Sequence, residues 1–199
     1  MPRKKRKKKR VSPVIIIILL AAIAVSVFLG VKLYEGLRQR FYQVKYAEEI
    51  KSAADRYSLD RALVAAMVNT ESRFKPDAVS VDGARGLMQV LPTTAEWIAY
   101  RRGLVYSEDN VDLFDVETNL DYGCWLMRYL LDRYEQNTRY ALIAYNAGFG
   151  RLDDWLENNV DENGVLADIP YAETRSYVRR ITELAEGYRK YGGLYDDEQ

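Results

Sequence analysis

Glu71 is the residue whose type and position most clearly predict chemistry in this sequence. It follows Leu63 and Met67 at the four-residue spacing of one helix face, and that face is otherwise apolar. A carboxyl group surrounded by apolar side chains loses solvation, which raises its pKa and keeps it protonated near neutral pH, the state that a general acid needs. From position alone, Glu71 could equally pair with Arg73 or Arg85 and only hold a loop together.

A polar segment with several small residues follows Glu71. Gly83, Ala84 and Gly86 allow the backbone to approach a ligand closely, and Ser80 and Gln89 offer hydrogen-bonding groups of the kind that bind a sugar hydroxyl or acetamido group. A glycine-bearing loop is more often a simple turn, so this spacing alone does not identify a site.

The composition excludes several classes of catalytic site. The chain contains no histidine, which excludes Ser-His-Asp and Cys-His nucleophiles and argues against the usual catalytic zinc sites. We therefore expect neither a metal ion nor an organic cofactor. Cys124, the single cysteine, shares a helical stripe with Leu120 and Met127, which predicts core packing.

The charges are distributed unevenly along the 199 residues. Of the 29 Lys and Arg residues, nine precede residue 34, and all 29 Asp and Glu residues follow it. The 20 remaining basic residues leave the rest of the chain with a charge of about −9, which argues against binding to nucleic acid.

The N-terminal part has the pattern of a membrane anchor. Basic residues fill positions 3–10, and residues 14–31 are uncharged, a length that reaches the threshold for a transmembrane helix. We expect a cytoplasmic tail over 1–13, an anchor over 14–33 with Lys32 at its far end, and a connector over 34–46 that can be helical. The positive-inside rule then places the chain in the cytoplasmic membrane with the N-terminus inside and the rest outside.

Two alternatives apply to this N-terminal part. Ala22-Ile23-Ala24 resembles a signal-peptide cleavage site, although apolar residues continue past it, which favours a retained anchor. The basic run could also be a nuclear-import or nucleic-acid patch, but its position next to the apolar span favours a role in topology.

The rest of the chain predicts a mostly α-helical domain over 47–191, followed by an acidic tail over 192–199. Sustained strand alternation and internal repeats are both missing from the sequence. Ser58 or Asp60 can cap the second helix, and Thr93 with Glu96 forms a capping-box pattern for the third. The expected helices cover 47–57, 60–72, 93–102, 117–136, 138–146, 151–157 and 171–191.

Four motifs occur in a fixed order along this domain: ESRF at 71–74, Ser80 with GARGLMQ at 83–89, AYNAG at 144–148, and IPYAETR at 169–175 with Tyr177 and Val178. Together they resemble the catalytic domain of the soluble lytic transglycosylases. The resemblance implies a lysozyme-like helical fold and cleavage of the β-1,4 bond between N-acetylmuramic acid and N-acetylglucosamine in peptidoglycan. We expect peptidoglycan glycan strands as the partner, with cell-wall synthesis or secretion machinery as further candidates.

The resemblance also implies which residues form the site. Glu71 would be the single catalytic acid and base, with the Tyr145 hydroxyl orienting it. Glu173 lines the groove in this view, although it could instead stabilise the N-terminus of its own helix. The predicted substrate-binding residues are Ser80, Gly86, Leu87, Met88, Gln89, Tyr145, Asn146, Glu173 and Tyr177.

The chain departs from the family pattern at two positions, with Leu91 where methionine is common and Phe149 where proline is common. Trp97, Tyr100 and Tyr106 could stack on sugar rings, but packing roles are expected for most of them.

The family mechanism needs one carboxyl group, because the muramic acid C6 hydroxyl replaces water and a 1,6-anhydro product forms. A hydrolase that resembles goose-type lysozyme is the alternative, with Asp77 or Asp82 activating water. A wall-binding scaffold without activity is a further alternative, although the chain retains Glu71 and the GLMQ turn.

Overall fold

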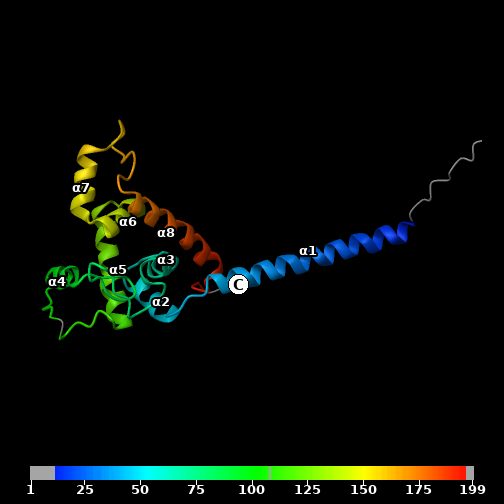
Figure 1. Cartoon of the computed structure of the whole chain (residues 1–199), viewed down its shortest axis with the longest axis horizontal. Coiled ribbons are helices and arrows are strands. Elements are labelled where there is room, and N and C mark those ends of the chain that lie inside the picture. The colour runs from blue at the N-terminus through cyan, green and yellow to red at the C-terminus, as the bar shows by residue number, and fades with distance from the viewer. Residues whose placement is uncertain (1–11, 108, 196–199) are drawn as a thin grey trace, which may run out of the picture. The chain divides into compact units, whose positions relative to one another are not determined.

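The computed structural model describes residues 12–107 and 109–195 (Figure 1). It divides into two compact units, Met1–Phe41 and Tyr42–Gln199, which are described separately here. Positions 1–11 of the predicted basic tail over 1–13 lie outside the described residues, as do positions 196–199 of the predicted acidic tail.

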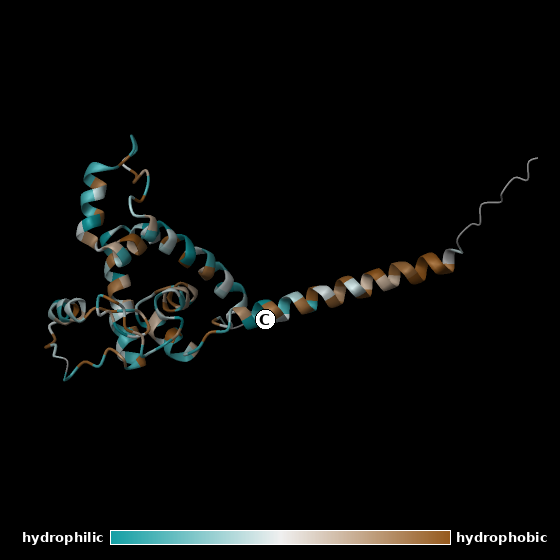
Figure 2. Cartoon of the chain, viewed as in Figure 1, coloured by the Kyte–Doolittle hydropathy of each residue, from teal (hydrophilic) through white to brown (hydrophobic). Residues whose placement is uncertain are grey.

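Helix α1, Pro13–Phe41, is the described part of the first unit. Its apolar side chains from Val14 to Val31 are exposed, and Figure 2 shows the hydrophobic colouring along this stretch. Among the described residues it is the one helix long and apolar enough to cross a membrane. The helix continues from the predicted anchor through the first part of the predicted connector. Lys32 of the anchor pairs with Glu35 at 3.1 Å, and Arg38 donates to the Tyr34 hydroxyl at 2.9 Å, each across one turn.

The second unit is helical, which confirms the predicted fold class. The pairing between extended segments in its described residues is limited to isolated bridges, such as Val79 with Arg85 and Arg85 with Val90. Its helices are α2 Ala47–Arg56, α3 Arg61–Ser72, α4 Pro92–Arg101, α5 Val116–Arg133, α6 Thr138–Ala147, α7 Phe149–Asn158 and α8 Ala172–Tyr191.

Helix α3 lies at the centre of this unit and packs most extensively against α8 (Figure 1). Every residue of α3 from Ala62 to Val68 is buried, because this stretch is apolar on all sides of the helix. The predicted apolar face of α8 meets it, with Ile181 and Tyr188 almost completely buried. The core therefore holds in place the helix that carries Glu71 in its last turn.

The helix boundaries follow the capping chemistry at most ends. Of the two predicted caps for α3, Asp60 is the one used, because its carboxylate accepts from the Ala62 N–H at 2.8 Å. The capping box of Thr93 with Glu96 is wrong. Pro92 occupies the first turn, where its missing N–H has no cost, so α4 begins earlier, with Leu91 at the cap position and no side-chain cap.

Two further boundaries differ from the predictions. Helix α5 ends at Arg133, before the predicted 136, because Glu135 and Gln136 adopt the left-handed conformation with φ of 53° and 63°. Gly150 lies inside α7, so only Gly148 separates α6 from α7. Cys124 is fully buried in α5, which confirms its predicted packing role.

Candidate active site

Glu71 sits in the last turn of α3, immediately before the chain reverses. The helix ends at Ser72, and Arg73 and Phe74 take left-handed φ values of 55° and 60°. The Ser72 hydroxyl donates back to the Val68 carbonyl at 3.1 Å and so remains within the helix. The sharp ending leaves the Glu71 side chain partly exposed at the edge of the core.

The Glu71 carboxyl group is held by a tyrosine from the last helix. The Tyr177 hydroxyl donates to Glu71 Oε1 at 2.6 Å. Burial raises the pKa of Glu71 to about 7, although the Tyr177 hydrogen bond acts in the opposite direction. Neither cause is an arginine, so the shift does not support the alternative in which Arg73 or Arg85 neutralises this carboxylate. Because Oε1 accepts from Tyr177, the proton of the neutral acid belongs on Oε2.

Tyr145 lies in the same electrostatic environment but makes a different bond. Burial raises the pKa of Tyr145 and of Tyr177 well above 10, and the charge of Glu71 raises both further. The Tyr145 hydroxyl donates to the Met88 carbonyl at 2.9 Å. Tyr145 was expected to orient Glu71, but the hydroxyl hydrogen-bonded to Glu71 in the structure is that of Tyr177.

The loop after Glu71 is built by several of the predicted substrate-binding residues. Ser80 Oγ accepts from the Ala84 N–H at 3.0 Å, and Gln89 Nε2 donates to the carbonyls of Ala78 at 3.2 Å and Gly86 at 3.0 Å. Gly86 has φ of 76°, and a Cβ atom there would lie 2.2 Å from the Leu113 carbonyl oxygen. The loop therefore requires glycine at position 86.

The side chains of Leu87 and Met88 point into the core and are fully buried. Met88 packs on Gly123, where an added Cβ would lie 2.4 Å from its sulfur, and its Sδ lies 3.9 Å from Cys124 Sγ. Any contact between Leu87 or Met88 and a sugar would therefore have to come from the backbone.

Asn119 supports this loop and was missed by the sequence analysis. It is fully buried in α5, its Oδ1 accepts from the Met88 N–H at 2.7 Å, and its Nδ2 donates to the carbonyls of Arg85 and Leu113, both at 2.8 Å. The only signal in the sequence was a polar residue on the buried side of a predicted helix. The partners are more than 30 positions away in two of the three bonds.

The start of α8 and the end of α6 meet through one polar contact. The buried Thr174 hydroxyl donates to Asn146 Oδ1 at 2.8 Å, which leaves the Asn146 NH₂ group, on an exposed side chain, to donate elsewhere. Glu173 is exposed in the first turn of α8, where a carboxylate interacts favourably with the helix dipole. Its role in the groove stays a prediction.

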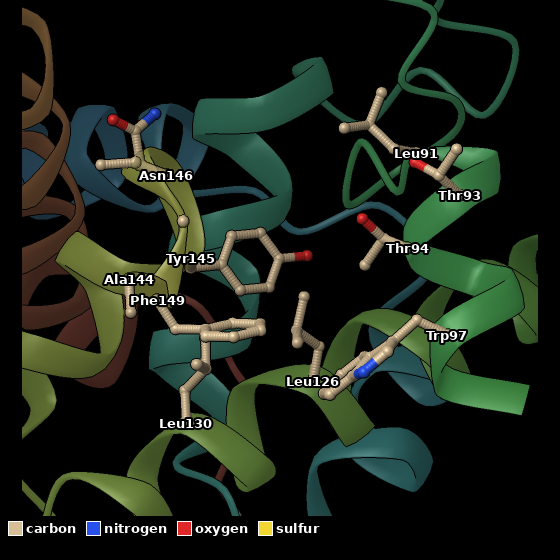
Figure 3. A pocket seen from close by; sticks show the side chains of 12 residues that line it. Leu91, Thr93, Thr94, Trp97, Leu126, Leu130, Ala144, Tyr145, Asn146 and Phe149 are labelled. Atoms are coloured by element: carbon tan, nitrogen blue, oxygen red, sulfur yellow. The ribbon is translucent and has the colours of Figure 1, made fainter. Parts of the chain in front are cut away.

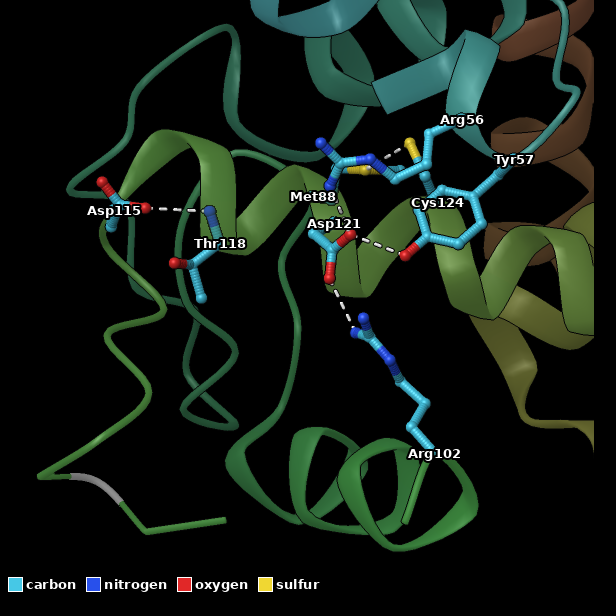
Figure 4. Close-up of polar contacts among 8 residues, drawn as sticks. All are labelled: Arg56, Tyr57, Met88, Arg102, Asp115, Thr118, Asp121 and Cys124. Atoms are coloured by element: carbon cyan, nitrogen blue, oxygen red, sulfur yellow. Dashed lines mark hydrogen bonds and ion pairs between the residues drawn. The ribbon is translucent and has the colours of Figure 1, made fainter. Parts of the chain in front are cut away.

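An ionic network centred on the partly buried Asp121 also holds α5 in place (Figure 4). Asp121 accepts from the Tyr57 hydroxyl at 2.6 Å, from Arg56 at 2.9 Å and from Arg102 at 2.7 Å. Burial acts to raise the pKa of Asp121, but the three hydrogen bonds outweigh it and lower the pKa. The network ties α2 and the C-terminal end of α4 to the helix that carries Asn119.

A cavity of about 370 Å³ lies beside Tyr145 (Figure 3). Of the three predicted stacking aromatics, Trp97 lines it, whereas Tyr100 is 79% exposed and Tyr106 is not part of the lining. Glu71 is not part of the lining either. The residues around the cavity are Leu91, Thr93, Thr94, Trp97, Leu126, Leu130, Ala144, Tyr145, Asn146, Ala147, Gly148 and Phe149.

Residues 48–166 match the family model described as the transglycosylase SLT domain. The chain belongs to the SLT transglycosylase family. It is 29% identical over 174 residues to the soluble lytic murein transglycosylase of Escherichia coli K12, with 86% of this chain and 27% of the relative covered. It is 33% identical over 168 residues to the membrane-bound lytic murein transglycosylase C of Edwardsiella ictaluri, with 73% and 47% covered.

The lysozyme-like fold is confirmed by the solved structures. The crystal structure of the 70 kDa soluble lytic transglycosylase from Escherichia coli matches with a TM-score of 0.68 at 29% identity, covering 78% of this SLT-family chain and 26% of that one. The chain spans about a quarter of the length of the soluble relatives and about half that of the membrane-bound ones.

Proposed function

We propose that this protein is a membrane-anchored lytic transglycosylase that cleaves peptidoglycan between N-acetylmuramic acid and N-acetylglucosamine. The observation that carries the proposal is the Glu71 carboxyl group, which is partly buried, hydrogen-bonded to Tyr177 at 2.6 Å and has a pKa raised to about 7. An acid with this pKa is substantially protonated at neutral pH and becomes a competent base once it has given up its proton. The names of the relatives supply the substrate class.

Glu71 acts in two steps in this mechanism. It first donates its Oε2 proton to the glycosidic oxygen, and the bond from that oxygen to C1 of muramic acid breaks while the substrate's own acetamido oxygen supports the positive charge at C1. The Glu71 carboxylate then takes the proton of the C6 hydroxyl as O6 bonds to C1. The acid is regenerated, no water is consumed, and the product carries a 1,6-anhydro ring.

The surrounding residues position the glycan in this proposal. Tyr177 holds Oε1, and Tyr145 fixes the GLMQ loop through the Met88 carbonyl. The free NH₂ group of Asn146 and the backbone of the loop from Gly86 to Gln89 offer hydrogen bonds to sugar hydroxyl and acetamido groups, with Ser80 shaping the loop and Glu173 at the groove edge.

The anchor defines where the enzyme acts. We propose that α1 crosses the cytoplasmic membrane once, with the basic N-terminus inside and the catalytic unit outside. The amino-acid pattern of the anchor supports this orientation, and the membrane-bound relatives support anchoring. The enzyme then works on glycan strands near the membrane, within reach of synthesis or secretion machinery.

Product analysis tests the proposed reaction. The full chain, purified in detergent, is incubated with isolated sacculi, and the soluble muropeptides are examined by mass spectrometry. We expect 1,6-anhydromuramic ends, and a loss of roughly 10²–10⁴-fold in rate for Glu71→Gln. Glu183→Gln, an exposed position on α8, is the matched control and should retain activity. Reducing muramic acid ends without the anhydro form would identify a hydrolase, and full activity of Glu71→Gln would refute the assignment of the acid.

A further inference from the structure

Tyr42 lies in the segment predicted to be a connector, yet its side chain is buried. It directly follows Phe41, the last residue of α1, and it is the first residue of the second unit, where only 7% of its surface is exposed. A segment that only joined an anchor to an enzyme would stay on the surface, as connecting segments almost always do. The burial of Tyr42 therefore indicates a role beyond joining the two units.

Gly187 in α8 leaves room for the Tyr42 ring. It is buried, and a Cβ atom built on it would lie 2.0 Å from Tyr42 Cζ and 2.4 Å from the Tyr42 hydroxyl oxygen. Even a methyl group would not fit beneath the ring. Glycine destabilises the interior of a helix relative to alanine, so the close approach of Tyr42 gives a physical reason for glycine at this position.

The Tyr42 ring packs against two tyrosines of α8. It meets Tyr188 edge to face with 5.4 Å between ring centroids, and it lies nearly parallel to Tyr191 with 5.8 Å between centroids. Tyr188 is only 1% exposed. Tyr42 therefore packs against a ring that belongs to the core of the second unit.

Tyr188 in turn contacts the end of α3 that carries Glu71. Its hydroxyl accepts from Asn69 Nδ2 at 2.5 Å, two positions before Glu71, and its ring meets Phe74 edge to face at 6.3 Å, three positions after Glu71. The Asn69 carbonyl accepts from the Arg73 N–H at 3.0 Å, which closes the last turn of the helix. One side chain of α8 thus contacts the chain on both sides of the proposed acid.

The same helix also carries the tyrosine that bonds to Glu71. Tyr177 lies near the start of α8, ten positions before Gly187, and its hydroxyl donates to Glu71 Oε1 at 2.6 Å. This bond depends on the position of α8 relative to α3, because hydrogen bonds weaken steeply when their geometry changes. Contacts that hold the other end of α8 against α3 therefore affect the geometry of the acid.

We propose that Tyr42 is a positioning residue for the reaction at Glu71. Its ring, packed on Gly187 and against Tyr188, holds α8 in the position at which Tyr177 meets the acid. The proposal rests on the proposed function, because it takes Glu71 as the acid. Tyr42 acts through α8 and not on the substrate, so the segment that joins the enzyme to its anchor also shapes the site.

Two substitutions test the contact from opposite sides. Tyr42→Ala deletes the ring, and Gly187→Ala displaces it, because the new methyl group would overlap the free end of the Tyr42 side chain. Each is made in the full chain in detergent, and muropeptide release from sacculi is measured at pH values on both sides of the Glu71 pKa of about 7.

Both variants should lower the maximal rate about tenfold, because the acid is no longer held in its productive position. The sacculus concentration that gives half the maximal rate should stay within about twofold, since Tyr42 does not bind the glycan. The alkaline limb of the pH–rate profile should move to higher pH, because a weakened Tyr177 bond stabilises the ionised carboxylate less.

Three controls separate positioning from folding. Gly150→Ala adds the same methyl group to an exposed glycine of α7 that has nothing within 4 Å, so it should leave the rate and the limb unchanged. Tyr42→Phe keeps the ring and should retain the rate to within about threefold. In the Tyr42→Ala background, Gly187→Ala should have no further effect, since the ring that it displaces is gone.

A lower rate with an unmoved limb would mean that Tyr42 only stabilises the fold, and it would overturn the proposal. Wild-type activity in Tyr42→Ala or additive losses in the double variant would do the same. If Tyr42→Ala does not fold, the limb of Gly187→Ala decides alone. A hydrolytic product of the wild type would refute the proposed reaction and leave the role of Tyr42 intact, whereas an unmoved limb would refute that role and leave the reaction intact.

Discussion

The surroundings of Glu71 and the aromatic cavity adjoin at Tyr145, but different forces hold them in place. Near Glu71, directional hydrogen bonds fix the groups one by one, from Tyr177 to the carboxyl and from Asn119 to the loop. In the cavity, Trp97 is held by several ring contacts, none of which is strongly directional. The hydrogen bonds near Glu71 hold each polar group in one position. The packing that stabilises the cavity is spread over the many atoms of its rings. A catalytic acid needs the directional hold that the hydrogen bonds around Glu71 supply.

Asn119→Ala should cause the largest loss of stability in either region. The variant leaves the buried Met88 N–H and the Leu113 carbonyl without their partner, and the Arg85 carbonyl keeps only its hydrogen bond from the Val90 N–H. Each unsatisfied buried group costs about 1–3 kcal/mol, so we expect a loss of roughly 3–5 kcal/mol in the free energy of unfolding. Chemical denaturation of the full chain in detergent, followed by circular dichroism, measures it.

Asn137→Ala is the comparison for this variant. Asn137 is exposed and caps α6 through one hydrogen bond to the Tyr140 N–H at 3.1 Å, so its loss should cost about 1 kcal/mol. If Trp125→Leu, on the aromatic side, destabilised the protein as much as Asn119→Ala, the contrast between the two regions would be wrong.

The fold was largely predictable from the sequence, because its helices have strong apolar periodicity. The stripe that ends in Glu71 correctly placed that residue at the edge of the core. The errors occurred where one local effect outweighed another. Pro92 determined the start of α4 in place of Thr93, and left-handed residues ended α5 early.

The polar contacts of the site were less predictable, because they join segments far apart in the chain. Tyr177 reaches Glu71 across 106 positions, and periodicity on α8 alone could not decide which tyrosine hydroxyl would bond to the acid. Asn119 gave almost no signal, since its three partners are backbone groups and have no side-chain signature. The two family departures, Leu91 and Phe149, were visible in the sequence, but only the structure places them around one cavity.

The Glu71 carboxyl group should also make stability depend on pH. Its pKa is about 7 in the folded chain against 4.5 in the unfolded chain, so between these values the folded state holds a proton that the unfolded state has lost. Stability therefore falls as pH rises through this window, and the ionised group costs up to about 3 kcal/mol above pH 7. Glu71→Gln should be about as stable as wild type at pH 4 and more stable at pH 8.

The measurement is the difference in unfolding free energy between wild type and Glu71→Gln at pH 4 and pH 8. Glu183→Gln, exposed on α8, should show no such difference at either pH. An equal effect of Glu71→Gln at both pH values would mean that the carboxyl group is not desolvated, and it would remove the physical basis for a general acid at this position. The lining of the aromatic cavity has no carboxyl group, and burial keeps the Tyr145 hydroxyl neutral by raising its pKa well above 10, so Trp97→Leu should change stability by the same amount at both pH values.

Tyr177→Phe should change the energetics of the protein least, but its effect should be specific to the ionisation of Glu71. The lost hydrogen bond favours the ionised carboxylate, so its removal should raise the pKa of Glu71 and move the alkaline limb of the pH–rate profile above pH 7. The maximal rate should fall about tenfold, because the carboxyl group is no longer fixed at Oε1. Tyr145→Phe is the matched control. Its hydroxyl bonds to the Met88 carbonyl, so that variant should lower the rate without shifting the limb. If both variants shifted the limb equally, the two tyrosines would share the role of orienting Glu71. Tyr145 would then belong with the surroundings of Glu71 and not with the aromatic cavity.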